Sequence, residues 1–174
     1  GQSMAGFRDG LSQTVAASER RISNGDRSRF SRARDFWYTG IYRIIWRIPD
    51  PDMMLTLCDA TDDWPPTWYP YAGQSWVRGN YNHTWYNHIA APNSSGPDCS
   101  VDYASNIPQS PPSDIWNNGT LAGSFKASSY HPGGVSVLYM DGSVRFTNDQ
   151  VDLRVWRAAA TRSSSDAVES SGVF

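Results

Sequence analysis

Three residues in the C-terminal third of the chain have the types that a hydrolase uses, namely Ser129, His131 and Asp141. Asp141 and the following Gly142, flanked by alternating apolar residues, are typical of a two-residue hairpin loop. Residues 135–140 in one strand would span roughly 16 to 20 Å at ~3.3 Å per residue, which separates Asp141 at the tip from His131 at the base. We therefore expect no catalytic site and no enzyme. We expect His131 to hold the start of the strand through a backbone carbonyl, and Asp141 to cap its own turn.

Metal chemistry has one candidate, an acidic cluster formed by Asp59, Asp62 and Asp63. Calcium takes several carboxylate oxygens, so this cluster is a weak candidate for a calcium site. It lacks the glycine and the closing glutamate of an EF-hand loop, and a solvated loop is the alternative. His83 and His88 have no glutamate between them, so the motif of a zinc peptidase is absent. No other cofactor is expected.

The two cysteines, Cys58 and Cys99, lie far apart in the sequence and have no second soft ligand at short spacing. This pattern disfavours a zinc site. If the protein is exported, a disulfide between them is the better interpretation. Such a bond would contribute on the order of 4 kcal/mol by restricting the unfolded chain.

The segment from residue 64 to residue 86 carries eight large aromatic rings between prolines and glycines. These rings belong to Trp64, Trp68, Tyr69, Tyr71, Trp76, Tyr81, Trp85 and Tyr86. Flat apolar rings with a polar edge suit three roles: a contact between subunits, a platform for sugars, or a lid over a sheet. An exposed patch of this size would carry an aggregation risk that a contact between subunits would remove. In that case, truncating Trp68 or Trp76 should weaken association.

The composition limits the class of protein. The chain has 174 residues, 39% of them hydrophobic and 13% aromatic, which is enough for one domain with a core. The net charge of −2, with Lys126 as the single lysine, gives no field that would recruit nucleic acid or an anionic membrane. No run of ~18 apolar residues exists, so we expect no membrane span.

The local patterns predict an α+β fold with an antiparallel β-sheet, long loops rich in proline, glycine and aromatic residues, and a short C-terminal helix. The expected order is a turn and a strand in 1–20, strands in 35–58, a long loop region in 59–129, a hairpin in 130–147, a helix in 148–161 and a tail in 162–174. Asn148 and Asp149 offer an N-cap for the helix. All of this fits one domain over residues 1–174.

The two-residue loop also predicts the register of the hairpin. The expected pairs are Met140 with Ser143, Tyr139 with Val144, Leu138 with Arg145, and Val137 with Phe146. The face expected in the core is formed by Val135, Val137, Tyr139, Val144 and Phe146. Phe146→Ala should then cost roughly 3–5 kcal/mol as a buried change, and Arg145→Ala should cost little.

The spacing of nine residues between His131 and Asp141-Gly142 resembles the His-x9-Asp-Gly signature of a large family of secreted, planctomycete-type pilin-like proteins. Other stretches similar to that family are residues 7–14, Gly73-Gln74-Ser75-Trp76, Pro92-Asn93-Ser94 before Cys99, and Val155-Trp156-Arg157-Ala158. The proteins of that family begin with a prepilin-type segment for cleavage and methylation. The hydrophobic helix of that segment is missing here, so the chain resembles the C-terminal globular part of a longer product.

The resemblance implies a fold like the globular head of a pilin or pseudopilin. It also implies an extracellular or cell-surface structural subunit of a pilus-like filament or of a secretion-associated pseudopilus. The partners would be copies of itself or sister pilin-like subunits. A secreted carbohydrate-binding module that uses residues 64–86 on surface glycans is the alternative, and a secreted hydrolase is a further one.

Three asparagines, Asn82, Asn93 and Asn118, stand in the acceptor pattern for N-glycosylation. The pattern is short and has many chance matches. We therefore treat the three asparagines as candidate sites, most of which a bacterial context would leave unused.

Overall fold

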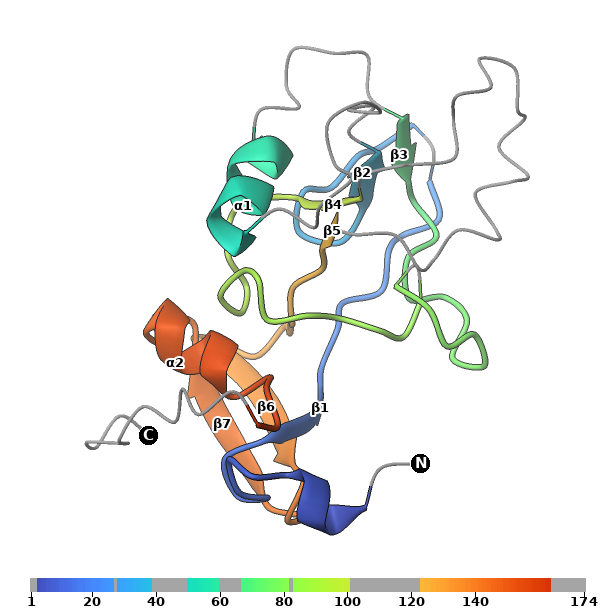
Figure 1. The fold of residues 1–174 in the computed structure, drawn as a ribbon. Coiled ribbons are helices and arrows are strands. Elements are labelled where there is room, and N and C mark those ends of the chain that lie inside the picture. The colour runs from blue at the N-terminus through green and yellow to red at the C-terminus, as the bar shows by residue number, and fades with distance from the viewer. Residues whose placement is uncertain are drawn as a thin grey trace.

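The computed structural model places the helices and strands of the chain around two β-sheets. The described residues are 3–26, 28–38, 50–59, 67–81, 83–100 and 123–163. In chain order the elements are the 3-10 helix η1 (Met4–Gly6), β1 (Val15–Ser18), β2 (Phe36–Tyr38), α1 (Pro51–Asp59), β3 (Thr67–Tyr69), β4 (Asp98–Ser100), β5 (Gly123–Ser124), β6 (Gly134–Tyr139), β7 (Val144–Asn148) and α2 (Leu153–Ala158). The two sheets lie one above the other in Figure 1. The predicted α+β class is confirmed.

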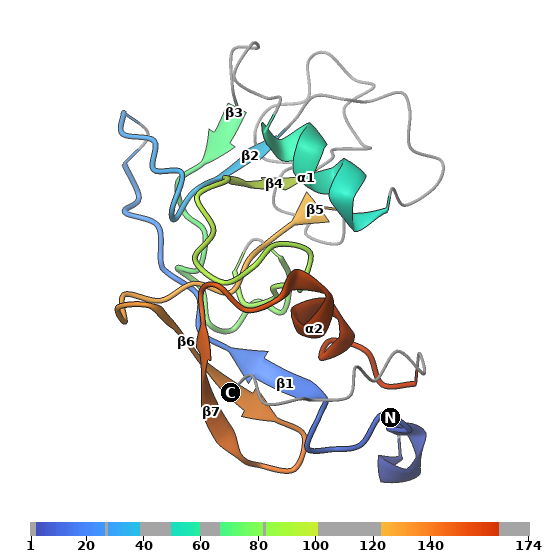
Figure 2. The same cartoon turned by 90° about the vertical axis from the view of Figure 1, so that its left-hand side faces the viewer.

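The first sheet brings the two ends of the described chain together. Its three strands are antiparallel in the order β1-β6-β7, and α2 packs beside them (Figure 2). Trp156 of α2 is buried in a cluster with Val135, Val137 and Tyr139 of β6 and with Ala127. The cluster holds the C-terminal helix against the hairpin.

The second sheet has the strand order β3-β2-β4-β5, in which β2 and β4 are parallel and the other pairs are antiparallel. Trp37 of β2 and Cys99 of β4 are buried with Met54 and Cys58 of α1. Three strands of this sheet, β3, β4 and β5, lie inside residues 59–129, where the sequence predicted only loops. With two or three residues each, they are too short to show an alternating pattern.

The helix α1 occupies the end of the region 35–58 that was predicted as strands, where the residues from Met53 to Asp59 also allowed a helical turn. The Oδ1 atom of Asp50 accepts hydrogen bonds from the main-chain nitrogens of Asp52 and Met53, both at 3.0 Å. Asp50 is therefore the N-cap, and Pro51 occupies the first helical position, where its missing N–H costs nothing. Only Phe36–Tyr38 is a strand among the described residues of the predicted region, and residues 39–49 lie outside the described part.

The hairpin forms, but its register differs by one residue from the prediction. The main-chain nitrogen of Tyr139 donates to the carbonyl oxygen of Ser143 at 2.9 Å, so the loop has three residues and ends at Gly142 with φ +85°. This geometry belongs to a three-residue hairpin with a glycine bulge. Val144 and Phe146 therefore lie on the exposed face, whereas Thr147 is buried.

The helix α2 is also shorter than the predicted 148–161. Its N-cap is Asp152, whose carboxylate accepts from the main-chain nitrogens of Arg154 and Val155. Asn148 instead closes a local turn by accepting from the nitrogen of Gln150 at 2.8 Å.

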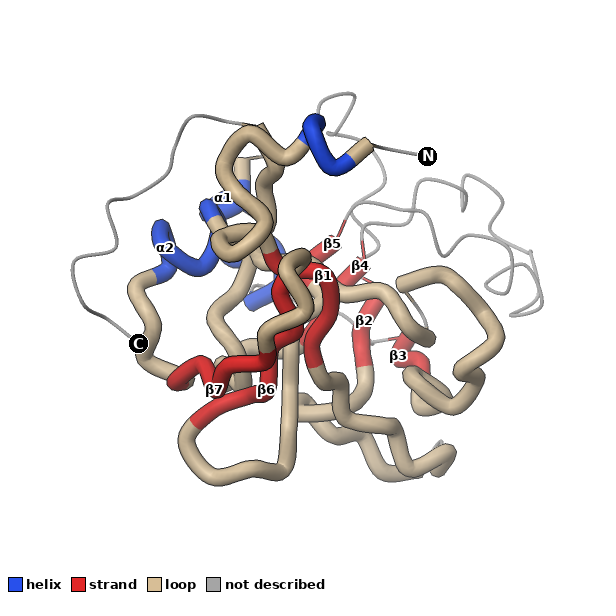
Figure 3. The backbone as a smooth tube through the Cα atoms, turned by 90° about the horizontal axis from the view of Figure 1, so that it is seen from below, coloured by secondary structure: helices blue, strands red, loops and turns tan. Residues whose placement is uncertain are grey.

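Seen from below (Figure 3), α1 and α2 lie on one side of the strands and long connections lie on the other. No described helix is long and apolar enough to cross a membrane.

Candidate functional site

The two residues of the predicted motif, His131 and Asp141, lie at opposite ends of β6. Asp141 caps the turn as predicted, because its Oδ1 atom accepts from the nitrogen of Ser143 at 2.9 Å and from its hydroxyl at 2.7 Å. His131 does not hold a carbonyl. Its Nε2 atom lies 3.2 Å from Oε1 of Glu19. The motif therefore marks both ends of one strand.

Glu19 is a site residue that the sequence did not reveal. Its Oε2 atom accepts from the main-chain nitrogen of Ser136 at 2.8 Å. Partial burial alone would raise the pKa of Glu19, but this bond, with Ser129 and His131, outweighs burial, and the pKa lies below its usual value. The carboxylate thus joins the end of β1 to β6 through Ser136 and to the segment before β6 through His131.

Ser129 lies close to Glu19 and His131, but not in the arrangement of a nucleophile and its base. The Ser129 hydroxyl oxygen accepts from the main-chain nitrogen of His131 at 3.1 Å, and the hydroxyl contributes to lowering the pKa of Glu19. The imidazole faces the carboxylate of Glu19 instead of the hydroxyl. These contacts fix the backbone and do not prepare Ser129 for attack.

Asn93 connects the same region from a third side. Its Oδ1 atom accepts from the nitrogen of Ser129 at 2.8 Å, and its Nδ2 atom donates to the carbonyl oxygen of Gly134 at 3.2 Å and to Oδ1 of Asp149 at 2.8 Å. Both amide hydrogens are therefore engaged, so a glycan on this nitrogen would break the links. The other two candidate glycosylation sites, Asn82 and Asn118, lie outside the described residues.

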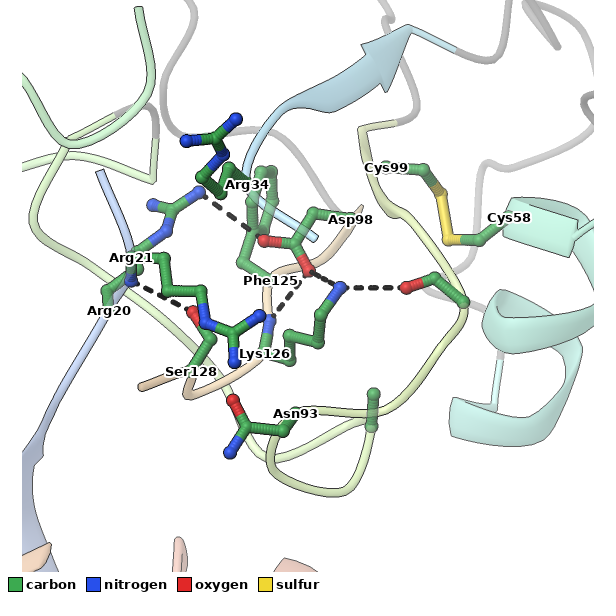
Figure 4. A network of polar contacts seen from close by, with 12 residues as sticks. Arg20, Arg21, Arg34, Cys58, Asn93, Asp98, Cys99, Phe125, Lys126 and Ser128 are labelled. Atoms are coloured by element: carbon green, nitrogen blue, oxygen red, sulfur yellow. Dashed lines mark hydrogen bonds and ion pairs between the residues drawn. A yellow bond between two sulfur atoms is a disulfide. The ribbon is translucent and has the colours of Figure 1, made fainter. Parts of the chain in front are cut away.

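A buried charge network joins the segment after β1, the strand β4 and the segment after β5 (Figure 4). Lys126 donates through Nζ to Oδ1 of Asp98 at 3.1 Å and to the carbonyl oxygen of Gly96 at 2.7 Å. Nη2 of Arg20 lies 3.5 Å from the other carboxylate oxygen of Asp98. Two cations thus share one carboxylate, and all three side chains are at least nine-tenths buried.

The network also holds the aromatic segment in place. Arg20 donates through Nη1 to the carbonyl oxygens of Tyr81 and Trp85. The Tyr81 ring stacks on Phe125 with centroids 4.9 Å apart, and the guanidinium of Arg20 lies over the Phe125 ring. Burial lowers the pKa of Arg20, and Asp98 opposes that shift. Sequence reasoning missed these contacts because they join residues far apart in the chain.

The predicted aromatic surface is divided between the core and the outside. Among its described rings, Tyr69 is buried, whereas Tyr71, Tyr81 and Tyr86 are half-buried. Two rings face outward: Trp76 is 88% exposed and Trp85 is 45% exposed. Trp64 and the side chain of Trp68 lie outside the described part.

Among the described residues, two groups of apolar side chains are exposed together. The first, here called the Trp76 knob, consists of Trp76 and Val77, which are 88% and 75% exposed. The knob lies in the segment that follows β3 in the chain. The second, called the hairpin face, consists of Leu138, Val144 and Phe146 on the outer side of β6 and β7.

The predicted disulfide between Cys58 and Cys99 is present, with the Cα atoms 5.4 Å apart. Both cysteines are buried, and the bond ties the end of α1 to β4. The next residue after Cys58, Asp59, is exposed at the end of α1, whereas Asp62 and Asp63 lie outside the described part. Over the described ranges, no group of three histidine, cysteine or acidic residues could hold a metal ion.

A cavity of about 570 Å³ lies where the two helices approach each other, with Pro51, His88, Ile89 and Arg157 among its lining residues. The His88 ring stacks on Trp156 with centroids 3.7 Å apart, and its Nδ1 atom is 2.6 Å from the carbonyl oxygen of Trp156. Burial lowers the pKa of His88 to about 4, despite this bond. His88 is therefore a neutral core residue at physiological pH.

Comparison with known families gives a match that covers most of the chain. The family described as "Protein of unknown function (DUF1559)" matches residues 1–154. The chain belongs to this family. Comparison with curated proteins and with solved structures finds no match. The matched residues of this DUF1559 protein include Glu19, the charge network and both ends of β6.

Proposed function

We propose that this DUF1559 domain is a structural subunit of an extracellular pilus-like filament or of a secretion-associated pseudopilus, assembled with copies of itself or with sister subunits. The observation that carries the proposal is the exposure of large apolar side chains on two separate surfaces, the Trp76 knob and the hairpin face. Soluble monomers rarely leave such groups uncovered side by side, because water contact with them is unfavourable.

The knob is firmly supported, which suits a contact that must keep its shape. The segment that carries it is held by Arg20, which binds the carbonyl oxygens of Tyr81 and Trp85. Gly73, with φ +75°, sets the backbone before the knob. A rigid aromatic side chain loses little conformational entropy on binding, so Trp76 is suited to anchor an interface.

The chemistry of the domain supports an exported structural role. A buried disulfide persists in an oxidising compartment and stabilises a domain outside the cell. The side chains considered for catalysis have structural contacts instead: His131 lies against Glu19, the Ser129 hydroxyl oxygen accepts from the main-chain nitrogen of His131, and Asp141 caps its turn. This use of the groups disfavours the hydrolase alternative.

The carbohydrate-binding alternative requires several exposed rings in one plane. Tyr81 and Trp85 meet edge to face with an interplanar angle of 88°, and Tyr81 stacks on the buried Phe125. Tyr81 and Trp85 therefore do not lie in one plane. The geometry therefore favours a protein contact over a sugar contact.

Sedimentation of the disulfide-intact chain over a wide concentration range tests the proposal. We expect the average mass to rise with concentration and Trp76→Ser to weaken association at least about tenfold, because an anchor residue contributes ~2 kcal/mol or more. Met53→Gln is the matched control, since Met53 is an exposed apolar residue of α1 outside both surfaces. A parent chain that stays monomeric at the highest concentration would overturn the proposal. Retardation of such a monomer on polysaccharide gels would favour the carbohydrate-binding alternative.

A further inference from the structure

The two edges of the first sheet differ in how their main-chain groups are covered. At the β1 edge, the nitrogen of Val15 donates to the carbonyl oxygen of Ala159 at 2.8 Å, and the oxygen of Glu19, just after β1, accepts from the nitrogen of Ser128 at 2.9 Å. Neighbouring segments therefore cover that edge. β7 forms the opposite edge of the sheet.

The hydrogen bonds at the two ends of the hairpin show which main-chain groups of β7 point outward. Tyr139 bonds Ser143 near the loop, and the nitrogen of Asp149 donates to the oxygen of Gly133 at 2.9 Å at the other end. Hydrogen-bonded pairs alternate along antiparallel strands, so Arg145 and Thr147 also direct their main-chain groups to β6. The residues between them, Val144, Phe146 and Asn148, direct theirs away from the sheet.

The outward groups of β7 have few partners within the described ranges. The carbonyl oxygen of Asn148 accepts from the nitrogen of Val151 at 3.1 Å. For the main-chain groups of Val144 and Phe146, no described residue provides a hydrogen-bond partner. The strand also lacks the proline or lysine that protects many sheet edges, and two of the three side chains on its exposed face, Val144 and Phe146, are apolar.

We infer that β7 pairs with β7 of a second copy of this chain, antiparallel and about a two-fold axis. This inference rests on the proposed function, because it specifies one contact of the assembly. The edge is complementary to itself, since outward N–H and C=O groups alternate on both copies. Pairing would join two three-stranded sheets into one continuous sheet and would place the two hairpin faces side by side.

Charge and apolar contacts select one register. An axis at Arg145 would set two guanidinium groups opposite each other, which is destabilising. An axis at Thr147 would set each Phe146 opposite a polar Asn148. An axis at Phe146 sets the two Phe146 rings opposite each other, places Val144 opposite Asn148, and places Arg145 opposite Thr147. We therefore assign the axis to Phe146.

The contact is isologous, so it closes on itself as a dimer and does not extend a filament alone. Extension would need a second surface, and the Trp76 knob is one that lies on a separate segment of the chain. The edge contact and the knob can therefore be tested independently.

Amide hydrogen exchange in the parent chain tests the edge directly. We expect exchange at Val144 and Phe146 to slow as concentration and sedimenting mass rise together, because the second copy then accepts their hydrogens. Arg145 and Thr147, which bond β6, should exchange slowly at every concentration. Fast exchange at Val144 and Phe146 in the assembled protein would overturn the inference. Slow exchange that does not depend on concentration would also overturn it, since the chain itself would then cover the edge.

A variant provides the second test. Phe146→Lys places two like charges at the axis and should weaken dimerisation at least about tenfold, whereas Phe146→Tyr should not. Phe146 is 52% exposed, and retained protection of the Arg145 amide would show that the variant hairpin is folded. If the parent assembles and Phe146→Lys assembles equally well, the edge contact is wrong and the proposed function stands. If the parent never associates, the edge contact and the proposed function are both wrong. If the parent stops at an edge-paired dimer, the edge contact stands and only the proposed filament is wrong.

Discussion

Leu138 lies opposite Val144 across the β6–β7 hairpin, and both side chains are exposed on its outer face. This pairing divides the hairpin into an outer face and a core face that holds Val135 and Val137. Phe146→Ala should therefore cost about 1 kcal/mol or less, whereas Val137→Ala should cost about 2–3 kcal/mol through lost burial and a cavity. Urea unfolding followed by fluorescence measures both changes. Similar large losses from both variants would contradict the register.

The disulfide between Cys58 and Cys99 should contribute strongly to stability. The two residues are separated by 41 positions, and closing a loop of that size contributes about 4 kcal/mol in the chain-entropy account. Replacing both cysteines by alanine should lower the free energy of unfolding by an amount of that order. Intact mass after alkylation without reduction checks the bond in the parent. Incorporation of two labels into the folded parent would contradict it.

The charge network predicts which of two substitutions lowers the free energy of unfolding more. Asp98→Asn leaves Lys126 and Arg20 buried without a carboxylate, and we expect a loss of about 3–5 kcal/mol. Lys126→Met should cost less, because Arg20 and Asp98 remain as a balanced pair. Urea unfolding curves of the two variants measure the difference.

The matched control for the network is Asp152→Asn. Asp152 pairs with Arg154 at 3.8 Å on the surface, and the ion pair itself contributes only about 0–1 kcal/mol. Asp152 also caps α2, but asparagine caps a helix about as well as aspartate, so the total loss should stay at about 0–1 kcal/mol. The network prediction fails if Asp98→Asn is no more costly than this control.

Acid should destabilise the domain through His88 before the carboxylates titrate. Burial lowers the pKa of His88 from 6.5 to about 4, so the unfolded chain binds a proton in a pH range where the folded domain does not. Its stabilising contribution is therefore present above pH 6.5 and is lost as pH falls toward 4, by about 3 kcal/mol in total. His83, whose pKa burial also lowers, acts with the same sign.

Unfolding free energies at several pH values between 7 and 4 measure this loss. His88→Phe keeps a ring against Trp156 and should reduce the slope between pH 6.5 and 4.5. A stability that is flat over that interval in the parent would show that His88 is not buried as described.

Local signals in the sequence predicted some features well. Asp141-Gly142 located the hairpin, and the isolation of Cys58 and Cys99 pointed to their bond. The register was wrong because alternation alone does not measure loop length: Gly142 at φ +85° adds a residue to the loop. The charge of Arg145 also suggested the wrong face of the sheet. Its guanidinium carbon lies 4.5 Å from the centroid of the Tyr139 ring, so the side chain packs over that ring on the core face.

The rest of the site depends on contacts between distant segments. Glu19 meets His131 where β1 pairs with β6, and Arg20 meets Asp98 of β4, and neither pair has a spacing that a sequence pattern would reveal. The short strands β4 and β5 exist because they pair with neighbours. Their own residues, Asp98–Ser100 and Gly123–Ser124, have little strand propensity.

Imaging of the native protein at the surface of the cells that produce it tests the central claim most directly. Antibodies against the Trp76 knob would be blocked in an assembly, so the label should be raised against the exposed tip at Asp141. We expect the label to follow filaments or short stalks with a regular repeat, and mutation of Trp76 to serine to disperse it. Label confined to single dispersed copies in the parent, with no regular structure, would contradict the account.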